Sequence, residues 1–151
     1  MFYVAYGMNT NKRAMAMRCP DAQSLGGFYL PNHKLIFRGV GDILEDKGSI
    51  APVVLWKITD NCLNALDKLE GYPHFYDRRL LNDQWLVYDM NGDKSETKEP
   101  SDHYYNMIDE GLREHGLQTD LLKKARSEAT IRTKYRKFSF FDAVNRSLRN
   151  D

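Results

Sequence analysis

Residues 60–70 predict an amphipathic helix, and this segment constrains the fold of the chain more than any other. Its apolar residues recur at helical spacing, which places in one stripe Cys62, Leu63, Leu66 and Leu69. Asp60 is a suitable N-cap, and Gly71 stands where a glycine commonly ends a helix. A helix with a single apolar stripe packs that stripe on a core, so the chain must supply other elements around it.

The remaining elements follow an irregular order, with strands early in the chain and helices late. Strands are expected at residues 2–6, 26–30, 34–38 and 50–58, with a turn at Pro31-Asn32 and a loop at 39–48. Strand pairs are expected between residues 79 and 90, before the turn signal Asn91-Gly92. Helices are expected at 12–18, 104–114 and 120–126. Because regular strand–helix–strand alternation is missing, the sequence predicts the α+β class and not a doubly wound sheet.

Size and composition indicate an ordinary globular protein. The chain has 151 residues, enough for one domain, and its 42% hydrophobic and 28% charged residues exclude wholesale disorder. The longest apolar run, 51–56, is too short to span a membrane, and the N-terminus lacks the basic and apolar regions of a signal peptide. Cys19 and Cys62 have no metal-ligand spacing. We therefore expect a cytoplasmic protein with reduced thiols, no metal and no cofactor.

Charge is distributed unevenly, although the formal net charge is only +1. Residues 123–149 contain nine basic and two acidic residues, whereas residues 1–122 contain thirteen basic and eighteen acidic ones. Residues 132–138 interleave basic and aromatic residues, a pattern that suits a nucleic-acid backbone. The alternative is an amphipathic helix at 138–148 that packs on the body through Phe141, Val144 and Leu148. We favour packing over nucleic-acid binding because no nucleic-acid motif is present.

Glu70 is the candidate acid–base residue. At about 100° per residue it lies roughly 20° from Leu63, inside the apolar stripe of the predicted helix. Desolvation there and the negative end of the helix dipole both raise the pKa of a carboxyl group, toward the range used in catalysis at neutral pH. The other interpretation is a carboxylate at the edge of the stripe, which faces solvent or pairs with Arg78 or Arg79.

A glycine loop at Tyr6-Gly7-Met8-Asn9 is the second candidate site. It lies between the predicted strand 2–6 and the predicted helix 12–18. Consecutive backbone N–H groups in such a loop form a cradle for an anion or an oxyanion. A glycine after a strand is also common in plain turns, so the loop alone does not establish a binding site.

The sequence of these two regions resembles one known family. Residues 3–9 read YVAYGMN, which is similar to a strand followed by Y-G-S-N in the gamma-glutamylcyclotransferase family and its AIG2-like relatives. Residues 63–71 read LNALDKLEG, which resembles the family's L-x-x-L-D-x-x-E-G and is the most specific match. Weaker similarities cover R-C-P-x-A at residues 18–22, L-x-F at 35–37, Pro100-Ser101, Tyr104, Gly111 and Gly116-Leu117. The resemblance covers residues 2–122, and 127–151 has no counterpart.

The resemblance implies a small mixed β-barrel with surrounding helices, and two parts of the chain, a domain at 1–126 and a basic C-terminal extension at 127–151. It also implies that Glu70 is the catalytic glutamate and that Tyr6, Gly7, Met8 and Asn9 hold the substrate through backbone amides. Tyr76 and Tyr104 resemble family residues near the pocket, although a structural role is favoured for Tyr76. Met8 departs from the family's usual serine, and it either reshapes the pocket or fills the core.

By resemblance, the chain is a metal-free cyclotransferase. Such an enzyme converts a gamma-glutamyl amine or gamma-glutamyl amino acid to 5-oxoproline and releases the amine, with Glu70 as general acid and base. Two alternatives stay open, a non-catalytic binder of gamma-glutamyl-like small ligands on the same fold, and an interaction protein that uses its basic tail on nucleic acid. The expected partner is a small-molecule substrate, and no binding to a membrane is expected. The leaving amine and the oligomeric state cannot be read from the sequence.

Overall fold

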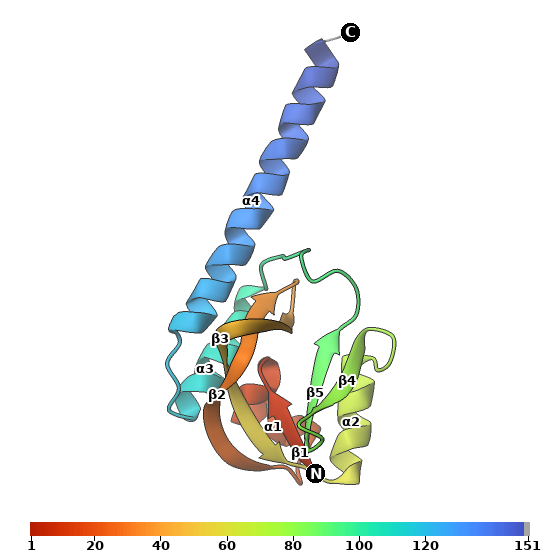
Figure 1. Ribbon diagram of the computed structural model, residues 1–151, viewed down its shortest axis with the longest axis vertical. Helices are drawn as coiled ribbons and strands as arrows, with labels where there is room; N and C mark the ends of the chain where they lie inside the picture. The colour runs from red at the N-terminus through yellow and green to blue at the C-terminus, as the bar shows by residue number, and fades with distance from the viewer. Residues whose placement is uncertain (150–151) are drawn as a thin grey trace.

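A five-stranded mixed sheet forms the centre of the computed structural model, which describes residues 1–149 (Figure 1). Its strands are β1 (Phe2–Ala5), β2 (Gln23–Phe37), β3 (Gly41–Lys57), β4 (Tyr76–Leu81) and β5 (Trp85–Met90), in the order β2-β3-β1-β5-β4. All neighbours are antiparallel except β1 and β5. The α+β class is confirmed. Among residues 1–149 no pairing joins the edge strands β2 and β4, so the sheet is open where the resemblance implied a barrel.

Helices cover both faces of the sheet. They are the 3-10 turn η1 (Met8–Thr10) and the helices α1 (Lys12–Arg18), α2 (Asp60–Glu70), α3 (Asp102–Glu114) and α4 (Asp120–Arg149). Side chains alternate between the two faces of a sheet along a strand, and those of β1 are buried on both faces. Tyr3 and Ala5 pack with residues of α1 and α2, whereas Val4 packs with residues of α3 and α4. The central strand β1 therefore ends between the two helical layers, and η1 follows it directly.

The predicted turn at Pro31-Asn32 and the predicted loop at 39–48 are wrong. β2 continues through Asn32, which has a positive φ of 58° beside a register shift, and residues 41–45 pair with 33–37. The hairpin turn lies instead between β2 and β3, at residues 38–40. Local polarity and glycine content indicated a loop at 39–48, but residues 41–45 pair with β2, and ladder hydrogen bonds satisfy their backbone groups.

The second hairpin turns inside the region where strand pairs were expected. Asn82 and Asp83, both with positive φ, connect β4 to β5, whereas Asn91 and Gly92 follow β5. Two adjacent left-handed residues match the right-handed twist of a tight hairpin, and asparagine and aspartate tolerate that conformation.

α4 is longer than expected and crosses the predicted boundary at residue 126 without a break. Its first half packs on the sheet through Leu122, Ala125 and Ala129, which are buried. The second half extends away from the sheet (Figure 1). Val144 and Leu148 are 39% and 69% exposed, so the predicted packing of these two side chains on the body is not observed. The side chain of Phe141 lies outside the described residues. No helix within residues 1–149 combines the length and apolarity needed to cross a membrane.

Gly111 of α3 sets how closely this helix approaches η1. A Cβ at Gly111 would lie 2.4 Å from Thr10 Oγ1 and 2.6 Å from the Asn11 backbone nitrogen. Only a glycine lets the helix contact the backbone of the turn at this distance. The contact holds the segment after β1 against α3.

We therefore expect Gly111→Ala to destabilise the protein. Alanine favours a helix by about 0.5–1 kcal/mol over glycine, but overpacking against backbone costs about 1–3 kcal/mol, so the clash decides the sign. Urea unfolding measures the change, with Asn106→Ala at an exposed position of the same helix as the control. A Gly111→Ala variant as stable as the wild type would show that α3 can move away from η1.

Candidate active site

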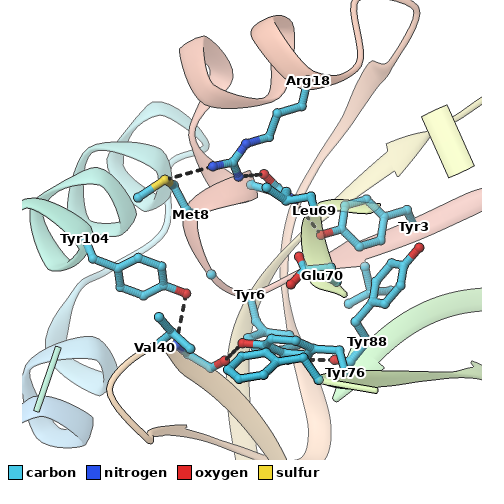
Figure 2. Close-up of a pocket in the computed structure, with 15 residues that line it drawn as sticks. Tyr3, Tyr6, Met8, Arg18, Val40, Leu69, Glu70, Tyr76, Tyr88 and Tyr104 are labelled. Carbon is cyan, nitrogen blue, oxygen red and sulfur yellow. Dashed lines mark hydrogen bonds between the residues drawn. The ribbon is translucent and has the colours of Figure 1, made fainter. Parts of the chain in front are cut away.

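A cavity of about 270 Å³ lies where β1, α1 and α2 end and η1 begins (Figure 2). The structure brings all seven predicted site residues to its wall, namely Tyr6, Gly7, Met8, Asn9, Glu70, Tyr76 and Tyr104. They come from segments far apart in the sequence, and the Glu70 carboxylate points into the space between the tyrosine rings (Figure 2). The juxtaposition of Glu70 with the glycine loop agrees with the prediction, while the chemical roles of these residues stay predictions.

The end of α2 is fixed so that Glu70 occupies its last position. Gly71 adopts the left-handed conformation, with φ of 63°, and its N–H donates to the carbonyls of Asp67 and Lys68. This is the predicted C-terminal cap, whereas the N-cap is Thr59 and not Asp60. The Asp67 carboxylate accepts hydrogen bonds from Arg78 at 2.7 Å and from the Tyr88 hydroxyl at 2.6 Å, which tie α2 to β4 and β5.

Burial raises the pKa of Glu70 from 4.5 to about 7, and the nearby charge of Arg18 opposes part of that rise. The direction and the desolvation agree with the position of Glu70 in the apolar stripe. Arg78 pairs with Asp67, and Arg79 pairs with Asp89 at 2.8 Å. Among the ion pairs of residues 1–149 none includes Glu70, so the interpretation as a paired surface carboxylate is not supported.

Gly7 allows the loop after β1 to pass directly beside Tyr104. A Cβ at Gly7 would lie 2.8 Å from the Tyr104 hydroxyl, which accepts a hydrogen bond of 2.9 Å from the Gly41 N–H. Burial raises the pKa of Tyr104 to about 12, against the effect of the Gly41 and Met8 N–H groups. Tyr104 is therefore a neutral hydroxyl held at the loop.

Asn9 anchors the loop, so its side chain is committed to the protein. The Asn9 amide nitrogen donates to the Tyr3 hydroxyl at 3.1 Å, its amide oxygen accepts from Arg18, and its backbone carbonyl accepts from the Trp56 indole at 2.9 Å. The first hydrogen bonds of η1 begin at Thr10, so the N–H groups of Met8 and Asn9 have no acceptor within the turn, and that of Met8 faces the Tyr104 hydroxyl. N–H groups at the start of a helix are left without helical partners in this way, and the use of this loop as an anion cradle stays a prediction.

Met8 lies at the wall of the cavity and is half-buried. Its sulfur accepts a hydrogen bond of 3.2 Å from Arg18. Met8 therefore lies at the cavity, and its effect on the shape of the pocket stays a prediction. Tyr76 is buried and donates to the Gly41 carbonyl at 2.7 Å, which is the structural partner expected for it, while its ring also lines the cavity.

Among the lining residues that sequence reasoning missed, three carry polar side chains, namely Arg18, Tyr3 and Tyr88. Arg18 belongs to the segment that resembles R-C-P-x-A, and it is the last residue of α1. Neither observation assigned it a function. Tyr3 and Tyr88 looked like ordinary strand residues, since only the parallel pairing of β1 with β5 brings them together, with ring centroids 5.9 Å apart.

Fold and site together define a small α+β protein with a ligand-sized pocket built around one carboxylate. The chain belongs to the gamma-glutamyl cyclotransferase, AIG2-like family, whose model matches residues 3–106. No curated protein gives a significant match.

Solved structures share the fold. One described as a gamma-glutamyl cyclotransferase is 24% identical, with a TM-score of 0.70 over 83% of this chain and 85% of that chain. An uncharacterized protein from Homo sapiens gives 24% identity and a TM-score of 0.69 over the same shares. YkqA from Bacillus subtilis gives 21% identity and a TM-score of 0.67 over 86% of this chain and 54% of that chain. These likenesses concern the fold.

The raised pKa of Glu70 predicts a pH-dependent cost in stability. Because the pKa rises on folding from 4.5 to about 7, the contribution of this group to stability is complete below pH 4.5 and is lost as the pH rises through 7. In Glu70→Gln this loss is absent. The difference in the free energy of unfolding, variant minus wild type, should therefore increase by up to about 3 kcal/mol between acid and neutral pH.

Urea unfolding of both proteins at a series of pH values measures this gain. Glu45→Gln is the control, because the Glu45 side chain is 74% exposed. A difference between Glu70→Gln and the wild type that stays constant with pH would contradict the desolvation of Glu70.

Proposed function

We propose that the protein cyclises a gamma-glutamyl group to 5-oxoproline and releases the attached amine or amino acid, with Glu70 as general acid and base. The observation that carries this proposal is the Glu70 carboxyl group in the cavity, with a pKa of about 7 and the glycine loop opposite it. A group with a pKa near the working pH accepts and returns a proton with little cost. Family membership supports the same reaction class.

The proposed reaction is an intramolecular displacement. Ionised Glu70 takes a proton from the substrate's α-ammonium, and the freed nitrogen attacks the γ-carbonyl carbon to form the ring C–N bond. Protonated Glu70 then donates that proton to the leaving nitrogen as the original amide C–N bond breaks. The ring nitrogen gives up its second proton to solvent as the released amine becomes protonated. Since the nucleophile and the carbonyl belong to one molecule, the reaction needs no second reactant, and the cavity has only to hold the substrate in the conformation that closes the ring.

The loop after β1 is proposed to stabilise the transition state. Negative charge develops on the γ-carbonyl oxygen as the ring closes, and backbone N–H groups at Gly7, Met8 and Asn9 are the donors proposed for it. Each donor of this kind contributes about 2.7–4 kcal/mol in oxyanion holes. Asn9 is held by Tyr3, Trp56 and Arg18, so the loop needs little reorganisation when charge appears.

One observation favours the alternative of a non-catalytic binder on the same fold. Met8 puts a thioether at the cavity wall where the family usually has a serine hydroxyl. If that hydroxyl takes part in the chemistry of relatives, this chain keeps the pocket without the reaction. The assay below decides between the two functions.

Purified protein incubated with a panel of gamma-glutamyl amines and gamma-glutamyl amino acids should release 5-oxoproline. Glu70→Gln should lower kcat by at least about 100-fold, since general acid–base catalysis contributes that much, while Glu45→Gln should leave the rate unchanged. Wild-type kcat/KM should rise with pH through about 7 as Glu70 ionises. Substrate binding without product would establish the binder, and an active Glu70→Gln would remove Glu70 from its role.

A further inference from the structure

Two charged side chains line the cavity among the described residues, Glu70 and Arg18. Glu70 is the last residue of α2, and Arg18 is the last residue of α1. Arg18 and Glu70 form no ion pair within 4.0 Å, although the charge of Arg18 is close enough to lower the Glu70 pKa. Opposite charges that face one cavity without touching leave a gap for a ligand that carries both signs.

Arg18 contacts the loop through two of its terminal nitrogens, and one of the two acceptors is weak. One of its terminal nitrogens donates to the Asn9 amide oxygen, and the other donates to the Met8 sulfur at 3.2 Å. A guanidinium has N–H donors beyond these two, and a thioether is a weak acceptor. A carboxylate in the cavity would therefore bind the guanidinium of Arg18 in place of the Met8 sulfur, because a carboxylate is the stronger acceptor.

A gamma-glutamyl group has the matching charges. Its α-ammonium and α-carboxylate are attached to the same carbon, and the proposed mechanism places the ammonium at Glu70. A carboxylate on that carbon is then within the same cavity as Arg18, the one cationic side chain among its described lining residues. We propose that Arg18 binds the α-carboxylate of the substrate and makes the pocket selective for a free α-amino acid head; this proposal rests on the proposed function for the identity of the substrate.

A purely structural role for Arg18 makes a different prediction. Because Arg18 contacts Met8 and Asn9, its loss also loosens the loop. A looser loop lowers the affinity for every ligand to the same extent. A carboxylate-binding role weakens only ligands that carry the carboxylate. The ratio of two ligands that differ in this one group therefore separates the roles.

The experiment compares L-5-oxoproline with its carboxamide in calorimetric titrations, since the product keeps the carboxylate but needs no catalysis to bind. Wild type should bind L-5-oxoproline about 10- to 100-fold more tightly than the carboxamide, the range expected for a charge-assisted hydrogen bond. Arg18→Met should bind both equally, and Arg18→Lys should keep part of the preference. Arg13→Met is the matched control, because Arg13 is on the same helix and its side chain is 68% exposed.

Turnover of a gamma-glutamyl amine and of its α-carboxamide by the same variants completes the test. A wild type without preference, or Arg18→Met with the wild-type preference, overturns the Arg18 proposal whether or not 5-oxoproline is produced. An Arg18-dependent preference in a protein without turnover supports the carboxylate site and overturns the cyclotransferase. If L-5-oxoproline neither binds nor is produced, both proposals are overturned.

Discussion

The anchoring of the segment after β1 is the constraint on which the rest of the site depends. This segment leaves the central strand between two helical layers, and two sets of contacts hold it. Asn9 is buried and bonded to Tyr3, Arg18 and Trp56, while Gly111 of α3 contacts the backbone of η1. A loop fixed this firmly presents the same backbone groups to every ligand, which is the condition for electrostatic preorganisation.

The site also contains a carboxylate, that of Glu70, for which the described residues supply no ion-pair partner. Asp67 takes Arg78 and Tyr88, so the end of α2 is secured by a residue one turn before Glu70. Glu70 itself is left beside tyrosine rings, where burial raises its pKa. A site of this kind reduces the stability of the folded protein at neutral pH in exchange for a group that can exchange a proton.

Most of the site could be predicted from local sequence because its main parts are local. The capped helix 60–70 and the glycine loop 6–9 are specified by residues within a few positions of each other, and each carries its own signal. The β2–β3 hairpin could not be predicted, because residues 41–45 form a strand only through pairing with 33–37. Arg18 was missed for a similar reason, since a basic residue at a helix end is common and only the fold brings it to Glu70.

The sequence by itself determined the α+β class, the inward position of Glu70 and the uneven charge of the chain, because periodicity, capping and composition are properties of neighbouring residues. Only the tertiary structure decided that α4 is one helix whose second half leaves the body, that the sheet stays open, and that Arg18 and Glu70 share a cavity without pairing. Those features depend on contacts between residues far apart in the chain, and such contacts are energetically defined only once the core has formed.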